Sequence, residues 1–315
     1  MANSEGIGGV HSFLLYGKET TWGTPVTVNS HFGTDTSFKA TINNNLKSNR
    51  GFKGTTTGGR NVIKFSSGVL DTSLALGFTV NRWNFMEFVT GAEGGAGPYT
   101  YDEDDVPPSL TIGSNIDNPG GSATDQLMTY QGCVVDTCAI KSSVGEPVTV
   151  NMDMKCQYGI LSTSLSTPVA LPDEEVYNFS GASVELPSSS AFPNIIDSLD
   201  ITIKNNWRLH TGLGDRRPVR ALPGEREYTI KITYKYLDND LMTAALGATT
   251  PTAVGGPTEY ATLVCNFVLG GKSMTMTFSG VPIGDFAQSH DLNETLSEDI
   301  TLTAKSLSCS EDRSV

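Results

Sequence analysis

Charged side chains are scarce in this chain of 315 residues, at 17%, and long apolar runs are missing. A helix that crosses a bilayer needs about 20 consecutive apolar residues, and no stretch approaches that length. The N-terminal residues also lack the basic-then-apolar order of a secretory signal. We therefore expect a protein that is made soluble inside a cell and has no membrane partner.

Signatures of catalysis are also missing. The four histidines, His11, His31, His210 and His290, stand in no recognisable catalytic setting, and there is no Gly-x-Ser-x-Gly, His-Glu-x-x-His or Walker sequence. Carboxylate pairs of a glycosidase need not be close in sequence, so an enzyme of that kind stays an alternative. The sequence favours a protein that is not an enzyme and holds no cofactor.

Cysteine is rare, with five residues at wide spacings, Cys133, Cys138, Cys156, Cys265 and Cys309. The number is odd, and Cys133 and Cys138 would face opposite sides of a strand. We interpret all five as buried thiols, with a disulfide or a zinc site as the alternative.

The net charge is −13 and the isoelectric point about 4.7. Such a surface repels polyanions, so tight binding to nucleic acid is disfavoured.

The residues that are abundant point to strands and turns. There are 33 glycines and 15 prolines beside many Thr, Ser, Val and Asn. In the stretch 226–237, Tyr228, Ile230, Ile232, Tyr234 and Tyr236 alternate with polar residues, which predicts a strand with one buried face. Asp238 and Gly247 then bracket a short predicted helix.

A similar unit stands earlier in the chain, and we interpret the pair as a diverged tandem duplication. The matches are Thr41–Asn45 with Thr202–Asn206, Gly59–Phe65 with the strand at 226–237, 81–91 with the helix, and Gly145–Met152 with Gly271–Phe278. In this alignment Ile63 corresponds to Ile230, so the first unit gains 11 residues around 68–79. The alternative is chance similarity between short β-rich segments.

Further alternating stretches fill in the two units. A strand is predicted at 38–42, a hairpin of 133–141 with 148–156 around Gly145, a strand at 199–204, a hairpin at 261–279, and a closing strand at 300–304 followed by a polar tail from Cys309. The boundaries follow as an N-terminal arm and first strand (1–30), a first module (31–160), a linker (161–176) and a second module (177–315). The first module carries an insertion at 91–131, whose run Asp102–Asp105 we interpret as a solvated loop, with a calcium site as the alternative.

Basic residues gather in two loops of this acidic chain. One account is a solvated loop whose arginines pair with local acids such as Asp215 and Glu225. The other is a contact between subunits, because guanidinium groups bind carboxylates bidentately. The candidates are Lys47, Arg50, Lys53 and Arg60 in the first loop and Arg208, Arg216, Arg217, Arg220 and Arg226 in the second.

The segment Gly17-Lys-Glu-Thr-Thr-Trp-Gly-Thr-Pro25 resembles the opening of tail tube (major tail) proteins of long-tailed bacteriophages. The order of 198–206, the loop to Gly224, the strand at 226–237 and the helix to Gly247 is also similar to that family. The resemblance implies β-sandwich or barrel-like modules whose strands join those of neighbouring copies into an inner β-barrel, in stacked rings of a virion tail made in the host cytoplasm.

Two modules per chain would let three chains build a ring with pseudo-sixfold symmetry. Partners would then be further copies, other tail proteins, and double-stranded DNA that passes through without tight binding. We expect Asp and Glu to outnumber Lys and Arg on the inner wall, for which the candidates are Asn151, Asp153, Asp200, Thr202 and Lys204. The competing hypothesis is a secreted β-sandwich that acts as a binding or adhesin-like module.

Overall fold

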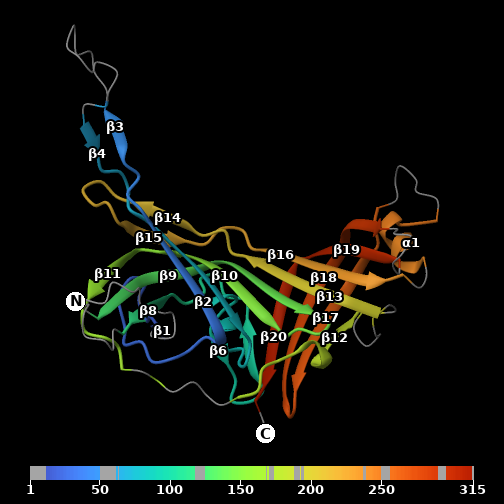
Figure 1. The fold of residues 1–315 in the computed structure, drawn as a ribbon. Helices are drawn as coiled ribbons and strands as arrows, with labels where there is room; N and C mark the ends of the chain where they lie inside the picture. The colour runs from blue at the N-terminus through green and yellow to red at the C-terminus, as the bar shows by residue number, and fades with distance from the viewer. Residues whose placement is uncertain are drawn as a thin grey trace, which may run out of the picture.

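The computed structural model describes residues 12–49, 62, 64–117, 125–167, 169, 174–187, 192, 195–236, 239–249, 256–289 and 296–313. It confirms a mainly β protein (Figure 1). Within these residues α1 (Asp240–Leu246) is the one α-helix, and it ends at Gly247 in the left-handed conformation, as the sequence predicts.

Eight antiparallel strands form what we call the central sheet. They stand side by side in the order β2-β5-β10-β9-β13-β16-β19-β18. Their bounds are β2 (Thr34–Asn43), β5 (Asp71–Thr79), β10 (Thr149–Cys156), β9 (Gln126–Ser143), β13 (Ile195–Lys204), β16 (Glu227–Lys235), β19 (Ser297–Ala304) and β18 (Lys272–Ser289).

Smaller groups of strands extend the N-terminal halves of β9 and β18. β1 (Ser12–Lys18), β8 (Leu110–Ile116) and β11 (Tyr158–Ser162) join β9. β18 joins β17 (Glu259–Leu269) and β20 (Ser306–Asp312), beyond which lie β12 (Ala182–Glu185), β7 (Tyr99–Asp102) and β6 (Glu93–Gly94). Two hairpins stand apart, β3 (Lys47–Asn49) with β4 (Lys64–Ser66) and β14 (Arg208–Thr211) with β15 (Pro218–Leu222).

The long strands β9 and β18 change partners halfway along their length. Each change comes at a glycine with φ of 61°, Gly132 in β9 and Gly280 in β18. A side chain at either position would be strained, because L-residues avoid this conformation. The two glycines therefore let one strand serve both the central sheet and a smaller group.

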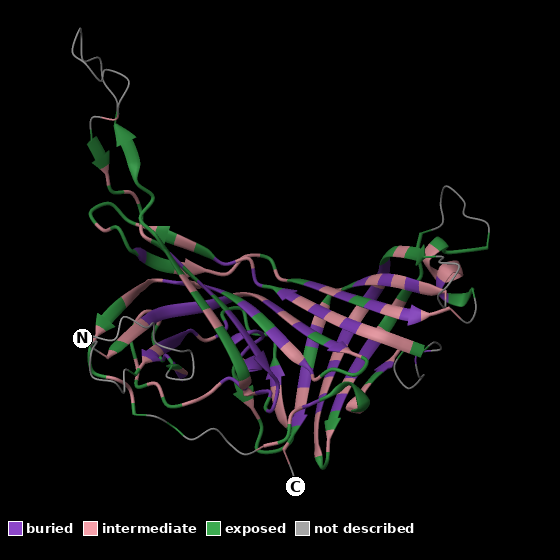
Figure 2. Ribbon diagram, in the orientation of Figure 1, coloured by how far each residue is buried: buried purple, intermediate pink, exposed green. Residues whose placement is uncertain are grey.

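One face of the central sheet is buried, as the alternation predicts. Tyr228, Ile230, Ile232 and Tyr234 are at most 3% exposed, and Leu199, Ile201 and Ile203 on β13 are equally buried. Figure 2 shows this alternation of buried and more exposed residues along the strands. The indole of Trp83 packs 5.0 Å from the ring of Phe267 and 5.5 Å from that of Tyr177, so the core is continuous across the chain.

The same connectivity occurs twice. We call β1–β5 with β8–β11 the first unit and β12–β20 the second unit. In the central sheet, β2-β5-β10-β9 and β13-β16-β19-β18 have the same order, and β3–β4 takes the place of β14–β15. β1, β8 and β11 surround β9 as β12, β17 and β20 surround β18. Local detail recurs as well. Asn45 and Asn206 have φ of 45° and 50°, and their side chains donate to the carbonyls of Val69 and Glu225.

Two of the sequence matches between the units are wrong. The strand equivalent to β16 is β5, which starts at Asp71, whereas residues 59–61 and 63 lie outside the described residues and 64–66 form the short β4. β5 and η2 (Asn84–Phe88) both stand 156 positions before β16 and α1, so no insertion of 11 residues separates them. Gly145 turns between β9 and β10 but Gly271 between β17 and β18, which occupy different places in the two connectivities.

Other expectations also change. The first unit has the short 3-10 helix η2 where a helix like α1 was expected. The polar tail is β20, in which Cys309 is fully buried. The insertion at 91–131 contains β6, β7, β8 and the start of β9, and its acidic run is partly engaged, since Glu103 Oε1 accepts from Tyr228 Oη at 2.6 Å. A second 3-10 helix, η3 (Phe179–Gly181), directly precedes β12 at the start of the second unit.

The interpretation of five thiols is wrong for two of them. Cys133 on β9 and Cys156 on β10 form a disulfide. Cys138, Cys265 and Cys309 are free and buried, and burial raises the pKa of each thiol. The two bonded cysteines meet because β9 and β10 are neighbours in the sheet.

Candidate functional site: the polar face of the central sheet

The face of the central sheet opposite the core is polar over all eight strands. Strand pairing brings Gly77, Asn151, Ala139, Thr202 and Thr229 into one row across the sheet. Because side chains alternate between the two faces, every second residue of each strand points the same way. The result is a wide surface of small polar side chains crossed by rows of charge.

The five residues expected on an inner wall all lie on this one face. Asn151 and Thr202 are both register partners of Ala139, and Asp153 and Lys204 are both partners of Thr137, from opposite sides of β9. Asp200 lies opposite Lys141. The structure thus brings the two candidate sets, from β10 and β13, together around β9.

Lysines on this face are almost all matched to a carboxylate. The Nζ–carboxylate distances are 3.1 Å for Lys141–Asp200, 2.9 Å for Lys155–Asp136, 3.8 Å for Lys204–Glu227, 3.0 Å for Lys231–Asp299 and 2.7 Å for Lys235–Asp197. Lys39, the sixth lysine, makes no ion pair within the described residues. The acids of the face are Asp71, Asp136, Asp153, Asp197, Asp200, Glu227, Asp285 and Asp299, so carboxylates outnumber lysines.

Asp299 illustrates how these pairs are held. Its burial acts to raise the pKa of the carboxyl group, but hydrogen bonds from Thr233 and Lys231 outweigh that effect, and the pKa lies below its ordinary value of 3.8. Thr233 Oγ1 donates to Asp299 Oδ1 at 2.6 Å. The carboxylate is therefore charged at neutral pH and holds Lys231 beside it.

Glu19 anchors the segment 17–25 to the bend of β9. Glu19 is 4% exposed, and its carboxylate accepts hydrogen bonds at 2.6–2.9 Å from Gly23 N, Ser109 Oγ, Thr111 Oγ1 and Gly132 N. Trp22 Nε1 donates to the carbonyl of Gly132 at 3.0 Å. Sequence reasoning used this segment only as a resemblance, and the structure gives it a role: it fixes the point where β9 enters the central sheet.

The basic candidates divide into two groups. Arg50, Lys53 and Arg60 lie outside the described residues. Lys47, Arg208 and Arg220 are exposed on the two hairpins, and the described residues offer them no ion pair. Lys47 and Arg208 each begin the first strand of a hairpin and occupy equivalent places, since their register partners are Ser66 and Leu222. Figure 1 shows both hairpins leaving the body at the same rim of the central sheet.

The other arginines have partners within the chain. Arg216 Nε donates to the carbonyl of Gly68 at 2.9 Å and its Nη2 to Asn44 Oδ1 at 2.8 Å, so the second hairpin is fastened to the first unit. Arg226 Nε donates to Asn205 Oδ1 at 2.8 Å.

Arg217 pairs locally, as the solvated-loop account expects. Its Nη2 lies 2.9 Å from Asp215 Oδ2, and its hydrogen bonds lower the pKa of that carboxyl group to about 2. The Arg217 guanidinium also lies over the ring of Tyr158.

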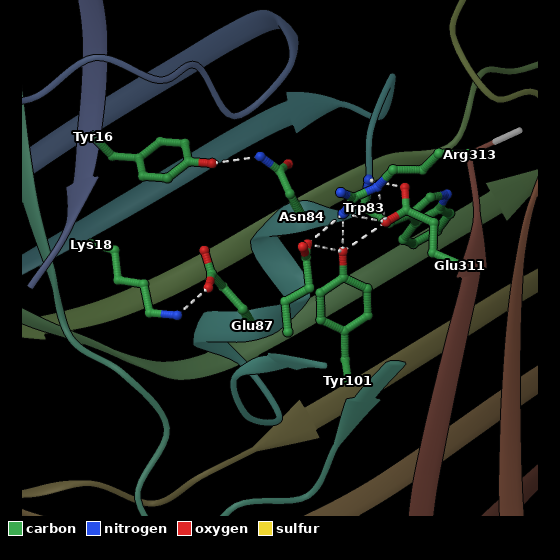
Figure 3. Close-up of polar contacts among 9 residues, drawn as sticks. Tyr16, Lys18, Trp83, Asn84, Glu87, Tyr101, Glu311 and Arg313 are labelled. Carbon is green, nitrogen blue, oxygen red and sulfur yellow. Dashed lines mark hydrogen bonds and ion pairs between the residues drawn. The ribbon is translucent and has the colours of Figure 1, made fainter. Parts of the chain in front are cut away.

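A polar cluster links β6 and β7 to the C-terminal strand β20. Tyr101 Oη donates to Glu311 Oε2 at 2.7 Å (Figure 3). Arg313 Nη2 lies 2.6 Å from Glu93 Oε2. Burial and the bond to Glu311 raise the pKa of Tyr101, so its hydroxyl stays protonated. Because Tyr101 and Glu93 come from the first half of the chain and Glu311 from β20, this cluster joins segments that lie far apart in the sequence.

Neither a metal site nor a membrane-spanning helix is found in the described part of the chain. No group of three or more His, Cys, Asp or Glu side chains is placed there to hold a metal ion. None of its helices is long and apolar enough to cross a bilayer.

A family model described as phage tail tube protein matches residues 9–304. No curated protein matches the chain.

Proposed function

The chain belongs to the phage tail tube protein family, a family of virion tail structural proteins, and we propose that three copies close into a ring whose inner wall is the polar face of the central sheet. The family match favours this interpretation over a secreted binding module. The proposal has three parts, which concern the ring, its charge and its stacking.

The repeated connectivity carries the proposal of a three-chain ring. Each chain places four strands of the first unit beside four strands of the second in one sheet, and we propose that the two units arose by tandem duplication. Three chains would then present six equivalent units around a closed barrel. Closure would also pair the strand edges at β2 and β18, which otherwise invite uncontrolled association.

Charge pairing on the polar face suits a wall along which DNA slides. A free lysine that contacts a phosphate displaces counterions and holds the duplex. Five of the six lysines lie within 4 Å of a carboxylate of the same face, and the remaining acids give the face a net negative charge. DNA would therefore meet little attraction as it passes during ejection.

The two basic hairpins are proposed to contact the next ring of the stack. Lys47, Arg208 and Arg220 are exposed at one rim, and a head-to-tail contact repeated along an axis produces a filament. Arg208→Glu with Arg220→Glu should shorten tubes or prevent them, while the subunit stays folded. Tubes of normal length from this double variant would remove the proposed role of the hairpin.

Negative-stain microscopy of the purified protein tests the function itself. We expect hollow tubes or rings. A sample that stays as compact monomers at all concentrations and salt conditions would contradict the proposal.

A further inference from the structure

We propose that neighbouring chains in the ring join through β2 of one copy and the C-terminal half of β18 of the next, in a register fixed by the contact between β9 and β13 inside each chain. This inference rests on the proposed ring and names the surfaces that form it. The partner at each strand edge is a second copy of the same chain.

Two strand edges of the central sheet have a neighbour on one side only. Among the described residues, β2 pairs with β5 alone, and residues 283–289 of β18 pair with β19 alone. The backbone groups on the free sides of both strands point outward and can accept another strand. Within the described residues, the eight-stranded sheet therefore has one open edge at each end.

The seam between β9 and β13 shows how two units meet. There Lys204 lies opposite Thr137, Thr202 opposite Ala139 and Asp200 opposite Lys141. Since β2 is the counterpart of β13 and β18 of β9, the same seam can form between chains.

The offsets in residue number between equivalent strands of the two units give the register of the proposed seam between β2 and β18. The turn residues Asn45 and Asn206 fix the offset between β2 and β13, while Gly132 and Gly280 fix that between β9 and β18. The bulge beside Asp153 on the β9–β10 pair recurs beside Thr301 on the β18–β19 pair, which confirms the second offset. Asn43 of one copy would then lie opposite Asp285 of the next, Thr41 opposite Ala287, and Lys39 opposite Ser289.

Exposure of apolar side chains supports this pairing. At the internal seam, Ile203 and Cys138 face each other and are both 0% exposed. Their counterparts at the open edges are Ile42, which is 44% exposed, and Phe286, which is partly exposed. In the proposed register Ile42 and Phe286 of adjacent copies lie opposite each other, so one contact would cover both.

Engineered cysteine pairs test the register. Thr41→Cys with Ala287→Cys should form a disulfide between chains, because directly opposite residues have Cβ atoms about 4.5–5.5 Å apart. We expect most of the oxidised tube protein to run as a covalent trimer on a non-reducing gel. The free native cysteines are buried and should not compete.

Two matched variants complete the experiment. Thr202→Cys with Ala139→Cys places the same pair at the internal seam and should cross-link within one chain. Asn43→Cys with Ser289→Cys is displaced by four residues, about 13 Å along the strand, and should stay uncross-linked.

The outcomes separate the register from the function. If the reduced Thr41→Cys, Ala287→Cys protein forms tubes but oxidation links no chains, the proposed register is wrong although the tube function stands. If the reduced protein forms no tubes while the wild-type chain does, the variants Thr41→Ser and Ala287→Ser show whether each edge tolerates substitution. Normal tubes from both of these variants, together with a cross-link between chains in the oxidised Asn43→Cys, Ser289→Cys protein, overturn the register. If the wild-type chain itself forms no rings, the proposed function fails first.

Discussion

Lys141 Nζ lies 3.1 Å from Asp200 Oδ2, across the seam where β9 of the first unit meets β13 of the second. This pair joins the two units on the polar face. As in the other four ion pairs of that face, the lysine and the carboxylate come from neighbouring strands.

Neutralising Asp200 should expose Lys141 to DNA. In assembled Asp200→Asn tubes we expect a fluorescent duplex to be retained several-fold more than in wild-type tubes at low salt, with the difference vanishing as salt rises. Folding stability should change by about 1 kcal/mol or less, because the pair is partly exposed. The double variant Lys141→Gln, Asp200→Asn should return retention to the wild-type level. Equal retention by all three tubes would argue against a sliding wall built from paired charges.

Equivalent glycines should be equally intolerant of a side chain. A Cβ on Gly68 would lie 2.2 Å from the Asn45 carbonyl oxygen, and one on Gly224 would lie 2.4 Å from that of Asn206. Gly68→Ala and Gly224→Ala should each lower the free energy of unfolding by about 2 kcal/mol or more. Gly256→Ala, where nothing lies within 4 Å, is the matched control and should be nearly neutral in urea unfolding. A large loss at one of the two glycines alone would contradict the local equivalence of the units.

Removing the buried carboxylate of Glu19 should destabilise the chain strongly. Glu19→Ala leaves four donors without their acceptor, and each buried unpaired group costs about 1–3 kcal/mol. We expect a loss of about 3 kcal/mol or more, and a smaller loss for Glu19→Gln, which keeps one acceptor oxygen. The exposed Glu146→Ala should stay within about 0.5 kcal/mol. Equal urea midpoints for Glu19→Ala and Glu146→Ala would remove the anchoring role of the segment 17–25.

Glu174 should make the fold sensitive to acid. Its pKa is lowered below the ordinary value of 4.5, first by the hydrogen bonds from Arg82, whose Nε lies 2.8 Å from Glu174 Oε2, and further by Lys272. A lowered folded-state pKa gives stability that is present above pH 4.5 and is lost as the pH falls through the folded-state value. Glu174→Gln should therefore flatten the fall in urea midpoint below pH 4.5, whereas the exposed neighbour Glu175→Gln should leave it unchanged. Parallel acid curves for wild type and Glu174→Gln would show that the pair does not couple to folding.

Much of the central sheet could be predicted from the sequence because large apolar and charged residues alternate in β13 and β16. β5 was not recognised as the counterpart of β16, because small residues, Ser73, Ala75 and Gly77, take the polar positions and weaken the alternation. The disulfide was missed although the predicted hairpin of 133–141 and 148–156 brings Cys133 beside Cys156, because the odd number and wide spacing of the cysteines favoured free thiols. Glu19 was recognised only within a motif, because Ser109, Thr111 and Gly132 reach it from distant parts of the chain.

Averaged electron cryomicroscopy of purified tubes tests the central claim most directly, because it counts the chains in one ring. The account predicts three chains per ring, with internal β9–β13 seams alternating with β18–β2 seams between chains around one closed barrel lined by Asp200 and its neighbours. Six whole chains per ring, or a wall lined by the hairpins with the central sheet outside, would contradict it.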